Sequence, residues 1–195
     1  MRQFFKRKGL LSDKEILKLR PLTGMADFQM KYRNLENESL PSCGLDSYGY
    51  DLRLSGNFRR PCGPIMKTTI GCMGEEQFCD NLPILIEPNS FILAVTVEEF
   101  RMPDDVYAII QGKSSWARIG VVIHGCPVDP GYKGPYSLHI ANVGPYPVQL
   151  YPQSGIARAI FFRGRKPRDA YHGAYMTKHH GPVTLHDIRL KGDQS

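Results

Sequence analysis

The chain has 195 residues, with 25 Lys and Arg against 19 Asp and Glu, which gives a formal net charge of +6. This length fits one domain with short appendages and is enough to bury a sizeable core. No run of about 18 apolar residues occurs, and the basic start of the chain lacks a long apolar segment, so we expect no membrane span and no signal peptide. The small positive excess favours an anionic partner. Because it includes no long basic run, we expect a phosphorylated small molecule rather than nucleic acid.

Five cysteines are present, an odd number, and no signal peptide precedes them. Reduced thiols and a cytoplasmic location are therefore expected. Cys43, Cys62, Cys72 and Cys79 lie close in sequence, but no Cys-x-x-Cys pair occurs among them, so the pattern argues against a structural zinc without excluding metal binding.

The first predicted element is a short helix. Ser12 begins the pattern Ser-Asp-Lys-Glu, which is typical of a capping box, and Ile16, Leu17 and Leu19 follow it. The helix is expected to end before Pro21.

From Pro41 onward, short apolar or alternating runs are separated by Gly, Pro, Asn or Asp, which indicates a mainly β barrel or sandwich. The predicted strands cover 48–54, 84–86, 91–97, 106–111, 119–124, 136–142, 148–151 and 156–162. Residues 59–81 are expected to be an irregular insertion, and the chain after Arg163 a basic tail rich in Gly and His.

The span 112–134 carries most of the functional signal. Lys113 begins a Lys-Ser-Ser-x-Ala-Arg run, whose ammonium, hydroxyl and guanidinium groups suit a polyphosphate. Asp129 begins an Asp-Pro-Gly turn, whose carboxylate suits a water or a sugar hydroxyl. The run is not a P-loop, because Tyr107 stands where the first glycine of that motif would fall. The span predicts a nucleotide-handling protein.

Several motifs, in the same order, resemble those of the trimeric dCTP deaminase/dUTPase superfamily, over about residues 10–185. They are LLSDKEI near the start, SYGYDLRL at 47–54, PNSFILAVTVEEFRMPDDV at 88–106, GKSSWARIG at 112–120, VDPGYKG at 128–134 followed by YSLHIAN, SGIARAIFF at 154–162 and AYMTKHHGPVTL at 174–185. The resemblance implies a distorted β-barrel of the jelly-roll, dUTPase-like type with a short N-terminal helix. It also implies a barrel domain over 1–170, a C-terminal lid over 171–195, and a homotrimer with three sites between subunits.

The resemblance also assigns site residues. The catalytic positions correspond to Ser114, Arg118, Asp129 and His139. The positions that contact the pyrimidine deoxynucleotide correspond to Gly112, Lys113, Ser115, Tyr132, Tyr171, Tyr175, Lys178 and His180. The lid departs from the family pattern, since Ala174 replaces the usual lysine and Lys178 or His180 the usual glutamine. Mg²⁺ is expected to accompany the triphosphate, and the H-x-E and P-C-x-x-C elements of zinc deaminases are missing.

The sharpest departure from the family is His139, which occupies the position of the deaminase glutamate, and residues 130–168 contain no Asp or Glu. Because Asp129 is kept while the glutamate is lost, we expect hydrolysis of dUTP or dCTP to the monophosphate and pyrophosphate. An atypical dCTP deaminase that uses His139, and a non-catalytic nucleotide-binding regulator, remain alternatives. Structural roles also stay open: a turn cap for Asp129, an interface ion pair for Arg118 and local hydrogen bonding for His139.

Overall fold

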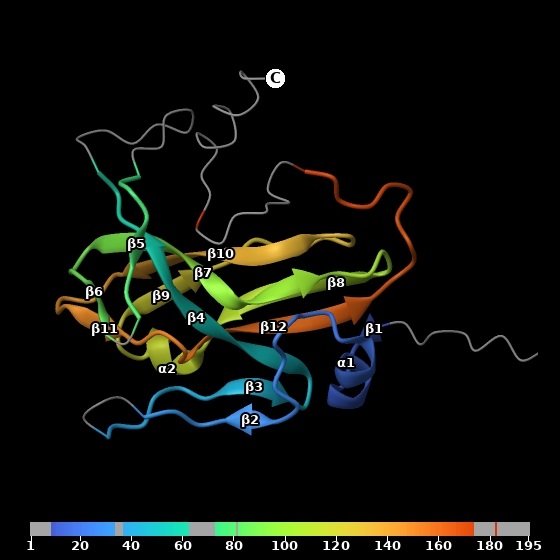
Figure 1. Cartoon of the computed structure of the whole chain (residues 1–195), viewed down its shortest axis with the longest axis horizontal. Coiled ribbons are helices and arrows are strands. Elements are labelled where there is room, and N and C mark those ends of the chain that lie inside the picture. The colour runs from blue at the N-terminus through green and yellow to red at the C-terminus, as the bar shows by residue number, and fades with distance from the viewer. Residues whose placement is uncertain (1–8, 34–36, 63–72, 81, 174–181, 183–195) are drawn as a thin grey trace, which may run out of the picture.

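The computed structural model describes residues 9–33, 37–62, 73–80, 82–173 and 182. Figure 1 shows the arrangement of the strands and of two short helices in this part of the chain. The elements are β1 (Gly9–Leu10), α1 (Asp13–Leu19), β2 (Gln29–Met30), β3 (Cys43–Asp46), β4 (Gly49–Arg59), β5 (Gln77–Phe78), β6 (Ile84–Ile86), β7 (Ser90–Arg101), β8 (Val106–Gly112), α2 (Ser114–Ala117), β9 (Val121–His124), β10 (Lys133–Asn142), β11 (Val148–Leu150) and β12 (Gly155–Arg163).

Six strands close into an antiparallel barrel. Hydrogen bonding runs in the order β12, β8, β9, β10, β7 and β4, and a further pairing of β4 with β12 completes the ring. Closure leaves no free edge within the ring, which is one way a mainly antiparallel fold avoids edge-to-edge association. The predicted mainly β barrel with a short N-terminal helix is confirmed.

The barrel interior is filled by side chains that alternate along each strand. On β10, Tyr136, Leu138 and Ile140 are buried, whereas Ser137 and His139 are only partly buried and lie on the outer face. The alternation follows from the period of two in a β-strand. Any functional group on an odd-numbered position of β10 is therefore presented outside the barrel.

The N-terminal helix α1 lies at one end of the barrel beside β1 and β12 (Figure 1). The backbone N–H of Ser12 donates a hydrogen bond of 3.0 Å to the Glu15 carboxylate, as the capping pattern predicts. Ile16 is fully buried. The helix ends at Arg20, whose positive φ of 48° places it in the left-handed region directly before Pro21.

The structure corrects several sequence-based boundaries. β4 and β7 run for 11 and 12 residues and are longer than predicted, while the strand expected from Ile119 begins only at Val121. The region 59–81 is not wholly irregular, because β4 continues to Arg59 and β5 pairs with β4. Short β1, β2 and β3 and the helix α2 were not predicted. None of the helices in the described ranges is long and apolar enough to cross a membrane.

Candidate active site on the outer face of the barrel

The hairpin formed by β9 and β10 opens next to His139. Its two strands pair from Val121 opposite Asn142 to His124 opposite His139, and the recorded register between them ends there. Toward the turn, β10 continues along β7 alone, as far as Lys133 opposite Arg101. Beyond the His124–His139 pair the two arms are not joined by strand pairing, and the Tyr136 hydroxyl on β10 donates to the Cys126 carbonyl of the other arm.

The turn of this hairpin carries Asp129 in an exposed position. The backbone N–H of Tyr132 donates to the Asp129 carbonyl at 3.2 Å, and Gly131 has a φ of +87°. A Cβ at Gly131 would also come within 3.0 Å of the Ala170 side chain. The turn therefore requires glycine at Gly131, and the Asp129 side chain is exposed to solvent.

His139 is half-buried on the outer face of β10. Its ring packs against Phe91, with ring centroids 4.7 Å apart and planes tilted by 38°. Burial, together with the charge of the neighbouring His124, lowers the pKa of His139 below the usual histidine value. At neutral pH the imidazole is consequently neutral, so one ring nitrogen can accept a proton.

The basic run lies at the end of β8. Lys113 is the N-cap residue of α2, and Ser114, Ser115 and Arg118 are exposed. Trp116 is buried beneath the helix and donates its indole N–H to the Gly155 carbonyl at 2.9 Å.

Gly112 allows a close approach between β8 and β9. A Cβ there would lie 3.0 Å from the Ile123 Cβ, which is tighter than most side-chain contacts. We therefore assign Gly112 to packing of the neighbouring strand in this chain, which the sequence alone did not indicate.

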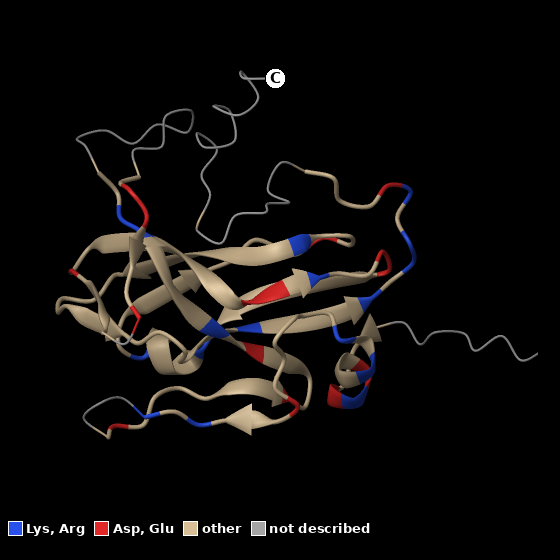
Figure 2. Ribbon diagram, viewed as in Figure 1, with Lys and Arg blue, Asp and Glu red and all other residues tan. Residues whose placement is uncertain are grey.

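The Lys113 ammonium binds a buried carboxylate that sequence reasoning missed. Its partner is Asp51 on β4, whose other oxygen accepts a 2.7 Å hydrogen bond from Nε of Arg158 on β12. Arg158 also pairs with Asp46, and its hydrogen bond to Asp51 raises the pKa of the guanidinium. Figure 2 shows the acidic and basic segments side by side where β4 crosses β12. The predicted phosphate-binding lysine is thus held in an ion cluster.

A second buried carboxylate, Glu98 on β7, anchors the opposite side of β4. It accepts hydrogen bonds from the backbone N–H and Nε of Arg53, at 2.9 and 2.7 Å, and from the Tyr50 hydroxyl at 3.3 Å. Burial raises the pKa of Tyr50 well above the usual tyrosine value. Glu98 is thus bound by Arg53 and Tyr50 of the neighbouring strand and has a structural role.

Of the predicted aromatic ligand contacts in the described part of the chain, one is buried in the core and the other is partly exposed. Tyr132 is buried, donates its hydroxyl to the Pro135 carbonyl at 2.7 Å and stacks near Phe100 and Tyr136. Its side chain is therefore part of the barrel end and not free to meet a ligand. Tyr171 packs against Tyr132, with ring centroids 5.8 Å apart, and remains partly exposed. The predicted lid residues Tyr175, Lys178 and His180 lie outside the described residues.

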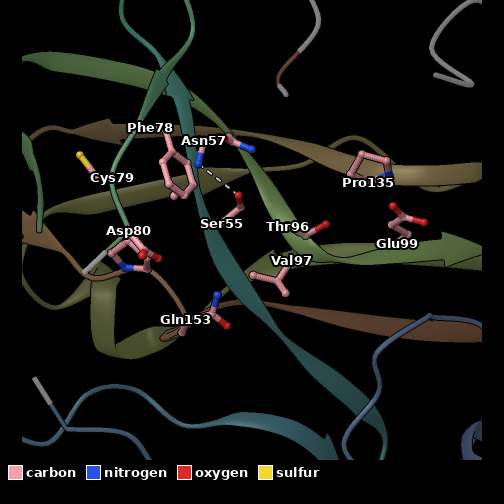
Figure 3. A pocket seen from close by; sticks show the side chains of 12 residues that line it. Ser55, Asn57, Phe78, Cys79, Asp80, Thr96, Val97, Glu99, Pro135 and Gln153 are labelled. Atoms are coloured by element: carbon pink, nitrogen blue, oxygen red, sulfur yellow. Dashed lines mark hydrogen bonds between the residues drawn. The ribbon is translucent and has the colours of Figure 1, made fainter. Parts of the chain in front are cut away.

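The described surface has at least two hollows. A groove of about 790 Å³ runs beside Arg118, between Ile119, Leu85 and the loop of Pro145 to Pro147. A smaller pocket of about 230 Å³ lies where β4 and β7 diverge, as Figure 3 shows. The smaller pocket has Asp80 and Glu99 in its lining and no basic side chain, so it does not suit an anionic nucleotide.

No group of three potential metal-ligating side chains occurs within the described ranges. Cys43, Cys62, Cys79 and Cys126 are free thiols, and burial raises the pKa of Cys43 to about 11. Cys72 lies outside the described residues. The carboxylate of Asp129 alone does not make a protein cage for Mg²⁺, which would have to share the oxygens of a triphosphate.

Comparison with known proteins assigns the family. Residues 11–164 match the sequence model of the dCTP deaminase-like family. The dCTP deaminase of Protochlamydia amoebophila is 34% identical over 177 residues, which cover 87% of this chain and 90% of that protein. The chain belongs to the dCTP deaminase-like family. A second relative in this family, the dCTP deaminase of Orientia tsutsugamushi, is 35% identical over 170 residues, covering 82% and 87% of the two chains.

Solved structures agree on the fold of this family member. The structure of 2'-deoxycytidine 5'-triphosphate deaminase from Agrobacterium tumefaciens matches with a TM-score of 0.60 and 18% identity, covering 82% of this chain and 49% of that one. The resemblance drawn from the motifs is therefore confirmed for family and fold. The relatives' names favour the deaminase alternative over the hydrolysis that the sequence ranked first.

Proposed function

We propose that the protein deaminates the cytosine of a deoxycytidine triphosphate, with His139 as the acid–base group. The observation that carries the proposal is the position and charge state of His139. It lies half-buried on the outer face of β10 where the hairpin opens, and its lowered pKa leaves it able to accept a proton at neutral pH. A neutral imidazole here would do the work that a carboxylate does in the family pattern.

The proposed reaction conserves atoms and protons. His139 takes one proton from a water as the remaining hydroxide bonds to C4 of the cytosine, and it returns that proton to N3. It then takes the proton of the new C4 hydroxyl and delivers it to the amino group, which leaves as ammonia while the C4 carbonyl forms. His139 ends neutral, and the nucleotide product is dUTP. One imidazole suffices for all four transfers because it both accepts and donates.

Within one chain, the predicted site residues other than His139 lie at both ends of the barrel. The bridge of Val128 with Ala108 places Asp129 near one end of β8, and Lys113 follows the other end at Gly112. Gly112 lies four positions after Ala108 along the strand, which is a distance of about 14 Å. We therefore propose a homotrimer in which the turn of one chain presents Asp129 to the Ser114 and Arg118 of a neighbour.

The surface beside Arg118 supports this assembly. The groove in it exposes three large apolar side chains with 39 to 76% exposure, namely Leu85, Ile119 and Tyr146. Apolar side chains gathered on one surface are typical of a protein interface. A second copy of the chain over this groove would cover them and bring Arg118 close to the opened hairpin of its neighbour.

Phosphoanhydride hydrolysis is the second candidate, because Asp129 is exposed and free to activate a water. Under either reaction Lys113, Ser115 and Tyr171 would contact the nucleotide, together with Tyr175, Lys178 and His180 of the proposed lid. Mg²⁺ would enter bound to the triphosphate. A regulator that only binds nucleotide is the third candidate.

One product assay separates the three functions. The wild-type protein is incubated with dCTP or dUTP and Mg²⁺, and ammonia and pyrophosphate are measured. We expect ammonia from dCTP, its loss in His139→Ala, and its persistence at reduced rate in His139→Glu, which restores the family's carboxylate. Pyrophosphate without ammonia, lost in Asp129→Asn, would establish the hydrolase instead. Neither product, with dCTP bound by calorimetry, would identify a binding protein.

A further inference from the structure

A row of polar side chains crosses the outer face of the barrel at the level of His139. Gln111 on β8 is opposite His124 on β9, and His124 is opposite His139 on β10. Directly opposite residues of antiparallel strands point to the same face, with Cβ atoms about 4.5–5.5 Å apart. Gln111 and His124 are exposed and His139 is half-buried, so all three lie on the outer face. His124 is thus flanked by a carboxamide and a second imidazole.

We propose that His124 is a positioning residue for His139, and that Gln111 orients His124 in turn. A neutral imidazole carries one donor and one acceptor nitrogen, so its tautomer and ring orientation are set by what each nitrogen meets. His124 offers His139 a partner of either kind across the strand pair. Gln111, which has both an acceptor oxygen and a donor nitrogen, can fix the tautomer of His124 from the other side. This inference rests on the proposed acid–base role of His139.

The other neighbours of His139 cannot take this part. On β7, His139 lies opposite Leu93 and packs against Phe91, and neither side chain titrates. On the next strand, β4, Arg59 lies opposite Leu93 and donates Nε to the Gly74 carbonyl at 3.0 Å. On its own strand the adjacent outer-face residues are Ser137 and Ala141. Beyond the end of β9 at His124, the next titratable group along the chain is Cys126, whose carbonyl accepts the Tyr136 hydroxyl.

In the proposed mechanism, two imidazoles that share one proton therefore take the place of the single carboxylate of the family pattern. When His139 takes a proton from water, neutral His124 can accept part of the charge through an N–H···N hydrogen bond. Burial and, second to it, the charge of His124 lower the pKa of His139. His124 thereby contributes to the pH below which His139 stops acting as a base.

The test is an NMR titration of the imidazoles in the full-length protein, with the His139 signals assigned by their loss in His139→Ala. We expect the pKa of His139 to rise in His124→Ala and its tautomer ratio to change. His124→Gln, which keeps hydrogen bonding without charge, should restore the tautomer but leave the pKa raised. Gln111→Met should alter the tautomer of His124. His172→Ala, which removes an exposed histidine after β12, is the matched control and should change neither.

Kinetics give a second, independent readout. In His124→Ala we expect kcat for ammonia release to fall at least about tenfold with little change in KM, and the acidic limb of the pH profile to move to higher pH. An unchanged pKa and tautomer of His139 in His124→Ala would overturn the positioning role, whether or not the wild type is active. Absence of ammonia from the wild type, with the NMR shifts present, would overturn the proposed function and leave the pairing intact.

Discussion

The buried Asp51 should be the most costly single charge to remove from this fold. Asp51 is fully buried and binds both Lys113, whose side chain is 12% exposed, and Arg158, whose side chain is 36% exposed. Removing one partner of a buried ion pair costs about 3–5 kcal/mol, because the other charge stays buried without compensation. In Asp51→Asn, Arg158 still pairs with Asp46 and is partly exposed to solvent, so the loss of stability arises mainly from the uncompensated charge of Lys113. We therefore expect the free energy of unfolding to fall by about 3 kcal/mol.

In a domain of this size 1 kcal/mol corresponds to about 2–4 °C in Tm, so Asp51→Asn should lower Tm by about 6–12 °C. Asp46→Asn is the matched control. The side chains of Asp46 and Arg158 are 31% and 36% exposed, so this ion pair should contribute less than about 1 kcal/mol to the free energy of unfolding. Adding Lys113→Met to Asp51→Asn should recover part of the loss, because the uncompensated charge is then gone. Calorimetric melts at one protein concentration measure all four proteins. Equal Tm shifts in Asp51→Asn and Asp46→Asn would refute the buried ion cluster.

Two further predictions concern stability against pH and assembly. The fold lowers the pKa of His139, so below its ordinary value of about 6.5 the unfolded chain binds a proton that the folded chain does not, and the free energy of unfolding should decrease as pH falls through this window. Urea titrations at pH 8 and pH 5.5 would measure the free energy of unfolding of the wild type and of His139→Gln. The loss of stability between the two pH values should be smaller in His139→Gln, and an equal loss in both proteins would contradict this prediction. The apolar surface beside Arg118 should be covered in solution, so light scattering should give about three chain masses, and Tyr146→Asp should shift the protein toward a monomer while Leu82→Asp, exposed elsewhere, should not.

The fold was largely predictable where the pattern is local. The capping box at Ser12 predicted α1, the alternation of apolar and polar residues predicted β10, and a mainly apolar run predicted β12. The helix α2 escaped prediction because its four residues bury only Trp116, which leaves no periodic apolar signal. The region 43–46 escaped because Cys-Gly-Leu-Asp does not alternate, although β3 pairs with β4.

The site was predictable as a set of motifs and not as a set of contacts. The resemblance pointed to Lys113 and His139, but their partners follow from strand register. Asp51 and Lys113 are 62 residues apart, and Asp51 and Arg158 are 107 apart, so no local signal joins them. The sequence allowed His124, Cys126 and His139 to approach one another, but only the pairing of β9 with β10 shows that His124 lies directly opposite His139.

The ion cluster also bears on how a triphosphate would be held. Asp46, Asp51, Lys113 and Arg158 carry two negative and two positive charges, so the cluster is neutral as a unit. Lys113 can bind a phosphate in two ways. Its ammonium can contact the phosphate and Asp51 together, or it can break its ion pair with Asp51, which would leave a buried carboxylate without that partner. Sharing is the less costly course, since an ammonium has three donors. Arg118 is exposed and makes no ion pair in the described part of the chain, so it offers the guanidinium whose charge is not already committed. Under the proposed function, the positive charge that a triphosphate would meet at this end of the barrel would therefore come chiefly from Arg118, with Lys113 as a fixed donor beside it.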